Sequence, residues 1–183
     1  MHQFAKWLLK RMGWVINGEL PNLDKYIIIV APHTSNWDFV ICMTARVALK
    51  LKIKFLAKHP LFYFPFGILM RSFGGLPVHR DRHENLVDAV IELFNQQQKL
   101  VLAIAPEGTR SPVKRWKQGF YHIAIGVKVP IVMIGPDYKS KQLRISPNCY
   151  PTGKIEQDFE HILSFFKEIS GRYSKKIPPY SKK

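Results

Sequence analysis

Acidic residues and cysteines are scarce in this sequence, and long apolar runs are absent. Its 183 residues include 13 acidic side chains against 28 lysines and arginines. The two cysteines, Cys42 and Cys149, have no metal-ligand spacing, so we expect neither a disulfide framework nor a metal site, and a reducing compartment is favoured. No apolar run reaches the ~20 residues that span a bilayer, and the N-terminus lacks the long apolar core of a secretory signal. We therefore expect a chain that does not cross a membrane.

The length and the apolar content suit one domain with a hydrophobic core. The formal charge of +15 predicts attraction to polyanions, which include nucleic acid, anionic lipid and acidic carrier proteins. The cations are spread through the chain, and the aromatic residues form apolar runs. Nucleic-acid binders instead interleave cations with stacking aromatic residues. We expect no nucleic-acid partner.

Apolar runs alternate with segments of helical periodicity. Strands are expected over residues 26–31, 52–58, 100–105, 129–134 and 143–145, with a short one before Arg80, and helices over 38–49, 60–73, 84–98, a segment after 119, and 155–170. Strands separated by helices of this length predict crossover connections and a parallel sheet. The expected fold is a single α/β domain with a mostly parallel mixed sheet flanked by helices. Sites in such folds lie beyond the carboxyl ends of the strands.

Two apolar segments have alternative interpretations. Residues 1–15 form an amphipathic helix, with Phe4, Leu8, Met12 and Val15 at helical spacing among cations. Such a helix lies in a membrane interface as an anchor, or it packs on its own domain. Residues 61–70 carry no charge and form either buried core or a lip that dips into lipid.

These segments give a three-part organisation of the chain. Residues 1–15 are the amphipathic helix, residues 16–173 are the domain, and residues 174–183 are a basic tail that contains two prolines. Such a tail is expected to be mobile.

The stretch from Ala31 to Asp38 contains the clearest candidate for chemistry. His33 can act as a base near neutral pH when a carboxylate on one ring nitrogen fixes its tautomer. Asp38 is the candidate carboxylate. On one continuous helix the two side chains would diverge by about 140°, so a working pair needs His33 on the loop and Asp38 in the first helical turn.

Ser35 lies between these two residues and suggests a catalytic triad. Its position two residues after His33 on a short loop favours a helix N-cap instead. In that role Ser35 caps the helix and is not a nucleophile.

Three further blocks follow in order: Gly74-Gly-Leu-Pro-Val-His-Arg80, Ala105-Pro-Glu-Gly-Thr-Arg-Ser111 and Val129-Pro-Ile-Val-Met-Ile134. Together with His33-x4-Asp38, this succession resembles the glycerolipid acyltransferase family over about residues 25 to 135. The family carries His-x4-Asp, Gly-to-Arg, Pro-Glu-Gly-Thr-Arg and Val-Pro-Ile motifs in that order. The second block usually ends Phe-Ile-x-Arg, whereas Pro77-Val78 replaces Phe-Ile here. The arginine is kept, but the acceptor pocket beside it is expected to differ in shape, which leaves the exact acceptor open.

The resemblance implies a glycerol-3-phosphate acyltransferase-like fold, with His33 and Asp38 catalytic. The candidate substrate-binding residues are Arg80, Glu107, Gly108, Thr109 and Arg110. The two arginines suit the phosphate of an acceptor, because a guanidinium matches phosphate oxygens in pairs. Glu107 binds an acceptor hydroxyl or fixes its loop, Gly108 permits a tight turn, and Thr109 hydrogen-bonds within the loop.

The expected activity is transfer of a fatty acyl group from acyl-CoA or acyl carrier protein, used as substrate with no cofactor, to a lysophosphatidic acid-like acceptor. Acylation of another lysophospholipid or lipid alcohol stays open, as does a non-catalytic basic protein that adsorbs to membranes. Because the acceptor resides in a bilayer, we expect contact with an anionic membrane surface. The expected location is cytoplasmic and peripheral, on the inner face of the cell membrane.

Overall fold

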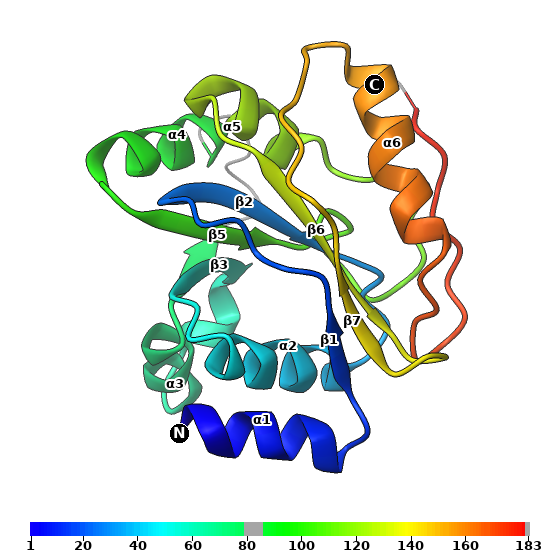
Figure 1. The fold of residues 1–183 in the computed structure, drawn as a ribbon. Helices are drawn as coiled ribbons and strands as arrows, with labels where there is room; N and C mark the ends of the chain where they lie inside the picture. The colour runs from blue at the N-terminus through cyan, green and yellow to red at the C-terminus, as the bar shows by residue number, and fades with distance from the viewer. Residues whose placement is uncertain (79–85, 182–183) are drawn as a thin grey trace.

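The computed structural model describes residues 1–78 and 86–181. Seven strands form one sheet in the order β1-β7-β6-β2-β5-β3-β4 (Figure 1). Neighbouring strands are parallel except β6 and β7, which are antiparallel. The chain therefore adopts the expected α/β class with a mostly parallel, mixed sheet.

The helices and strands follow one another through the whole chain. In order they are α1 (His2–Arg11), β1 (Val15–Asn17), β2 (Lys25–Val30), α2 (Asn36–Ala48), β3 (Ile53–Lys58), the 3₁₀ helix η1 (His59–Phe62), α3 (Phe66–Ser72), β4 (Gly75–Val78), α4 (Leu86–Gln96), β5 (Leu100–Ile104), α5 (Gly119–Val127), β6 (Ile131–Asp137), β7 (Gln142–Ile145) and α6 (Ile155–Lys167).

Helices cover both faces of the sheet. Figure 1 shows α1 and α2 on one side and α4, α5 and α6 on the other. The central strand β2 contributes to both cores: Tyr26 and Ile28 face α1 and α2, while Ile27 and Ile29 face the opposite helices. Burial on both faces explains why β2 is a continuous apolar run with no alternation of polar residues.

The expected strands and longer helices are present, with shifts of a few residues at their ends. Strand β1 is absent from the sequence prediction. It has only three residues and pairs with β7 through its backbone. A strand this short has no recognisable alternation of side chains in the sequence. The segment over residues 60–73 divides at Pro65, with η1 before it and α3 after it.

Helix α1 combines the two alternatives that the sequence leaves open. Ala5 and Leu9 are buried in the core shared with α2, so the helix packs on its own domain. Phe4 and Trp7 are exposed, and their rings stack with centroids 5.6 Å apart. One face therefore anchors the helix to the domain, and a different face offers aromatic surface to solvent.

Residues 61–70 are largely at the surface. Phe62 and Gly67 are buried in this segment, whereas Phe64 is 86% exposed, and Phe66 and Ile68 are also exposed. Of the two alternatives for this apolar segment, burial in the core does not hold.

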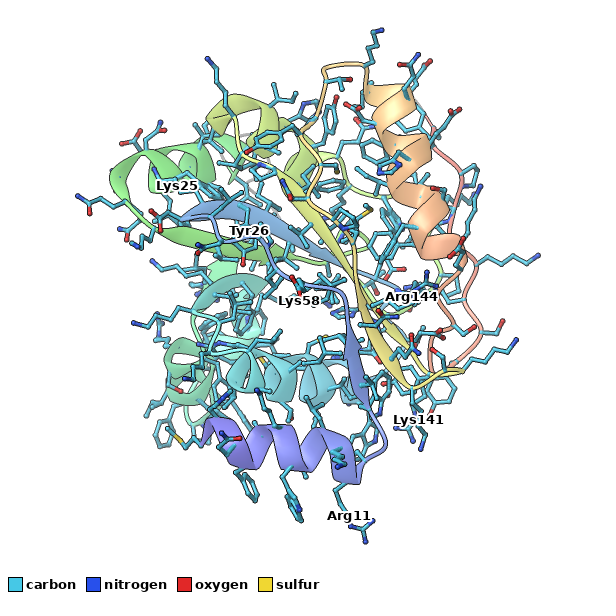
Figure 2. The ribbon with its side chains drawn as sticks, in the orientation of Figure 1. Arg11, Lys25, Tyr26, Lys58, Lys141 and Arg144 are labelled. Carbon is cyan, nitrogen blue, oxygen red and sulfur yellow. The ribbon has the colours of Figure 1, made fainter. Side chains whose placement is uncertain are left out.

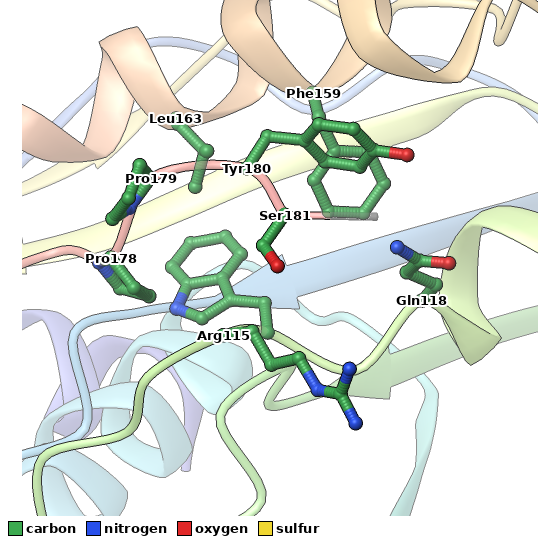
Figure 3. Close-up of a pocket in the computed structure, with 9 residues that line it drawn as sticks. Arg115, Gln118, Phe159, Leu163, Pro178, Pro179, Tyr180 and Ser181 are labelled. Atoms are coloured by element: carbon green, nitrogen blue, oxygen red, sulfur yellow. The ribbon is translucent and has the colours of Figure 1, made fainter. Parts of the chain in front are cut away.

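The C-terminal segment differs from the expected mobile tail. Residues 174–181 lie against the domain, and Pro178, Tyr180 and Ser181 line a small pocket with Trp116 and Phe159 (Figure 3). Ile177 and Tyr180 also pack against the core beneath α6. Apolar side chains within a basic, proline-bearing stretch account for this docking.

Basic side chains extend from several elements. Figure 2 labels Arg11 on α1, Lys58 at the end of β3 and Lys141 before β7. This spread agrees with the dispersal of lysine and arginine along the chain. Within the described part of the chain, no helix has the length and apolar content needed to span a membrane.

Candidate active site

The carboxyl ends of β2 and β5 lie side by side at the same end of the sheet. The strands are adjacent and parallel, and Ile29 pairs with Ile104 in their register. The loops that follow carry His33 and Glu107. The backbone N–H of His33 donates a hydrogen bond of 2.7 Å to Glu107 Oε2, which joins the two loops directly.

Asp38 lies in the first turn of α2, as the spacing requires. Ser35 is the N-cap of this helix, and its hydroxyl accepts a hydrogen bond from Trp37 N–H. Asp38 completes a capping box, because its Oδ2 accepts from the backbone N–H groups of Thr34 at 2.7 Å and Ser35 at 2.8 Å. Ser35 therefore has the capping role that the sequence favours.

The second oxygen of Asp38 is also held. Tyr138, which directly follows β6, donates its hydroxyl to Asp38 Oδ1 at 2.7 Å. The Asp38 side chain is completely buried. Three donors thus fix the orientation of a carboxylate that has no contact with solvent.

The imidazole of His33 faces this carboxylate. His33 Nδ1 lies 3.9 Å from Asp38 Oδ2. This distance allows an electrostatic interaction but is too long for a hydrogen bond. Nδ1 is buried and has no hydrogen-bond partner among the described residues. The side chain as a whole is 29% exposed, so the ring is accessible although Nδ1 is not. A proton on Nδ1 directed at Asp38 leaves Nε2 as the basic nitrogen.

The surroundings of His33 favour the neutral imidazole. Burial lowers its pKa below the ordinary value, and the positive charges of Arg110 and Lys175 act in the same direction. The Asp38 carboxylate opposes this by raising the pKa. The net effect is a ring that is unprotonated, and so competent as a base, at neutral pH.

Glu107 performs the second of its two expected roles by fixing its loop. Its side chain is fully buried, and Oε2 accepts from His33 N–H and forms an ion pair of 3.0 Å with Lys175. Burial raises the pKa of Glu107, while these two partners lower it. The carboxylate therefore connects protein segments, and binding of an acceptor hydroxyl stays a prediction.

The remaining residues of the second loop follow Glu107. Gly108 has a φ of +64°, a left-handed conformation that explains glycine at this turn. Thr109 Oγ1 accepts a hydrogen bond of 3.3 Å from Ser111 N–H, within the loop as expected. Arg110 is exposed and near enough to lower the pKa of His33. Arg80 lies outside the described residues.

Two residues of this site have no signal in the sequence. Tyr138 comes from the end of a buried strand, and Lys175 comes from the segment expected to be mobile. Neither belongs to a motif, and both reach the site through the tertiary fold, from 100 residues beyond Asp38 and 142 beyond His33 respectively.

The arrangement places an imidazole, a buried carboxylate and an exposed arginine at the carboxyl ends of two parallel strands. The acyltransferase family model matches residues 4–135. The chain belongs to the acyltransferase family and is an acyltransferase.

A solved structure agrees with this assignment of the fold. The crystal structure of the 1-acyl-sn-glycerophosphate (LPA) acyltransferase PlsC from Thermotoga maritima is similar, with a TM-score of 0.63 and 17% sequence identity. The match covers 91% of this chain and 75% of that one. No curated protein matches the sequence.

The electrostatics of His33 predict how its pKa responds to substitution. Arg110→Gln removes a positive charge and should raise the pKa of His33, whereas Asp38→Asn removes the opposing negative charge and should lower it. NMR titration of the imidazole resonances measures both changes. Lys114→Gln, on the same loop and exposed, is the control and should leave the titration unchanged. An Arg110→Gln titration identical to wild type would contradict an electrostatic effect of Arg110 on His33.

Proposed function

We propose that this enzyme transfers a fatty acyl group from acyl-CoA or acyl carrier protein to the free hydroxyl of a lysophosphatidic acid-like acceptor. The observation that carries the proposal is the partly exposed imidazole of His33, whose Nδ1 faces the buried carboxylate of Asp38. The order of the sequence blocks resembling glycerolipid acyltransferases supports the substrate class. The chemistry needs no cofactor, because the donor thioester is itself a substrate.

His33 acts as the general base in this mechanism. Its Nε2 takes the proton of the acceptor hydroxyl as the oxygen forms a bond to the thioester carbonyl carbon. The tetrahedral intermediate then collapses with cleavage of the C–S bond, and the imidazolium returns the proton to the leaving thiolate. The products are an ester and a free thiol, and no covalent enzyme intermediate forms.

Asp38 holds the imidazole in the required tautomer and stabilises the imidazolium that forms during proton transfer. The carboxylate and ring are 3.9 Å apart before the reaction, and catalytic hydrogen bonds often tighten only in the substrate complex. The three protein donors to Asp38 keep it in place while the ring changes charge.

Arg110 and Arg80 bind the phosphate of the acceptor. Arg110 is exposed on the loop next to Glu107, and its charge influences His33. A phosphate there would place the acceptor headgroup beside the base. The role of Arg80 rests on its motif alone.

The protein works at the surface of an anionic membrane, on the cytoplasmic face. The exposed aromatic side chains of α1 and of residues 61–70 supply apolar surface, and Lys6, Lys10 and Arg11 supply charge. A lysolipid and a long acyl chain reside in the bilayer, whereas the carrier stays in water. An enzyme that joins them acts at the boundary.

The alternative acceptors are other lysophospholipids or lipid alcohols. Incubation of the enzyme and vesicles with mixed acyl donors and a panel of lysolipids, followed by mass analysis of the products, distinguishes them. The panel also tests the non-catalytic alternative, a basic membrane-adsorbed protein. Such a protein has no need for a partly exposed histidine facing a buried aspartate.

Replacement of the base should strongly reduce turnover while leaving the fold intact. His33→Ala is expected to lose about 10²-fold to 10⁴-fold in kcat, and Asp38→Asn should also be impaired. Acyl transfer to lysophosphatidic acid is measured by product mass, and circular dichroism checks the fold. His122→Ala, an exposed histidine on α5, is the matched control. Near-normal transfer by folded His33→Ala would refute the mechanism.

The phosphate assignment predicts a selective loss of acceptor affinity. Arg80→Lys and Arg110→Lys keep the charge but lose the planar fork, so acceptor binding should weaken by at most about 1.5 to 3 kcal/mol each. The measurement is the dependence of rate on acceptor and on donor concentration. Donor dependence should change less, and an unchanged acceptor dependence in both variants would show that the phosphate binds elsewhere.

Vesicle binding should have a salt-sensitive and a salt-resistant part. Each basic side chain near an anionic surface contributes about 1 kcal/mol that salt screens, whereas buried aromatic surface is insensitive to salt. Sedimentation with anionic vesicles across a salt series should show weakened but persistent binding. Phe4→Ser with Trp7→Ser, at exposed positions, should remove much of the salt-resistant part without unfolding the domain. Binding equal to wild type at every salt concentration would exclude α1 as a contact.

A further inference from the structure

The chain returns to the candidate active site after α6. Ser170 O accepts a hydrogen bond of 2.8 Å from Tyr138 N–H, at the end of β6. Two residues later, Arg172 N–H donates to the hydroxyl of Thr34 at 3.0 Å, directly beside His33. Residues 170–175 thus form a strap across the carboxyl end of the sheet, and we refer to them as the C-terminal strap.

The strap approaches the His33 loop very closely. A Cβ atom at Gly171 would lie 2.6 Å from Thr34 Cγ2 and 3.2 Å from Pro32 Cγ. A side chain at residue 171 would therefore require the Thr34 side chain or the strap to shift, which glycine avoids. Arg172 adds to the attachment, because its guanidinium lies over the Trp37 ring at 5.5 Å.

Lys175 makes the innermost contacts of the strap. Its side chain is 3% exposed. The Nζ atom lies 3.0 Å from Glu107 Oε2, and it donates to the carbonyl of His33 at 2.9 Å and to the carbonyl of Thr109 at 3.1 Å. An ammonium has three protons, and these three acceptors use all of them.

The three acceptors belong to the two loops that carry the site. His33 O lies on the loop after β2, and Glu107 and Thr109 lie on the loop after β5. Glu107 Oε2 also accepts from His33 N–H, so the peptide groups on both sides of the His33 Cα are held by this cluster. With the backbone of His33 held on both sides, the point from which its side chain extends is fixed relative to Asp38.

We propose that Lys175 is a positioning residue for catalysis, and that the C-terminal strap completes the active site by locking the His33 loop to the Thr109 loop. The proposal rests on the proposed role of His33 as base. Lys175 acts through the main chain of His33 and not on substrate, since its donors are already occupied. The strap lies beyond residues 4–135, the part of the chain that the family model matches.

Loss of the ammonium has two separable consequences. The Glu107 carboxylate loses its buried counter-ion, and the two carbonyls lose a donor, so the His33 loop is no longer held at one geometry. The electrostatic balance of the imidazole also changes. The charges of Asp38, Arg110 and Lys175 shift the pKa of the imidazole, and Lys175 is one of the two that lower it. The Glu107 carboxylate is a further charged group, bound to the His33 N–H and paired with Lys175. Removal of the Lys175 charge should therefore raise the pKa of His33.

Lys175→Met tests the proposal, with Lys176→Met as the control. Methionine keeps the apolar stem without the charge, and Lys176 is the exposed neighbour with the same charge. We expect kcat of Lys175→Met to fall about 10-fold to 10²-fold, as for a small misplacement of a catalytic group, with acceptor KM little changed. The acid limb of the pH profile of kcat, which reports protonation of His33, should move to higher pH. Lys175→Arg should recover the acid limb and part of kcat.

Gly171→Ala keeps the test decisive where Lys175→Met fails to fold. It alters no charge but displaces the strap from Thr34, so kcat should fall while the acid limb stays in place. Wild-type kcat and pH profile in folded Lys175→Met, or wild-type kcat in Gly171→Ala, would overturn the proposal. An inactive His33→Ala with fully active strap variants would refute the positioning role alone. An active His33→Ala would refute the proposed mechanism itself.

Discussion

The geometry of the site depends on the interactions of the buried Glu107 carboxylate. One of its oxygens accepts from the His33 N–H and pairs with Lys175, so three segments converge on a single atom. Burial of a charged carboxylate costs free energy unless hydrogen-bond donors or an opposite charge compensate for the lost water. Removal of the Lys175 ammonium would leave the Glu107 charge uncompensated in the protein interior. The contacts of Glu107 Oε2 therefore also hold the His33 loop in place.

Asp38 near His33 is likewise a buried carboxylate that several donors hold in place. Helix α2 needs acceptors for its first N–H groups, and Asp38 supplies one as part of the capping box. The residue that completes the capping box is thus also the residue that faces the imidazole. One side chain therefore both stabilises the start of the helix and faces the histidine on the preceding loop.

The domain has exposed apolar surface in two segments. Apolar side chains of α1 and residues 61–70 are exposed in spite of the cost to solubility, whereas Ala5, Leu9 and Phe62 secure the same segments to the core. A surface of this kind suits a substrate that resides in lipid. The site itself lies at the carboxyl end of the sheet, where Arg110 adds positive charge.

Local features determined how much the sequence revealed by itself. The apolar run over residues 26–31 predicted a buried strand, which agrees with β2 and the burial of both its faces. The placement of His33 on a loop and Asp38 in the first helical turn was predictable because the two residues are only five positions apart. The positions of Tyr138 and Lys175 were decided by the tertiary structure alone. Their partners are 100 and 142 residues away, and a buried acceptor recruits a donor by proximity in space, which leaves no pattern along the chain.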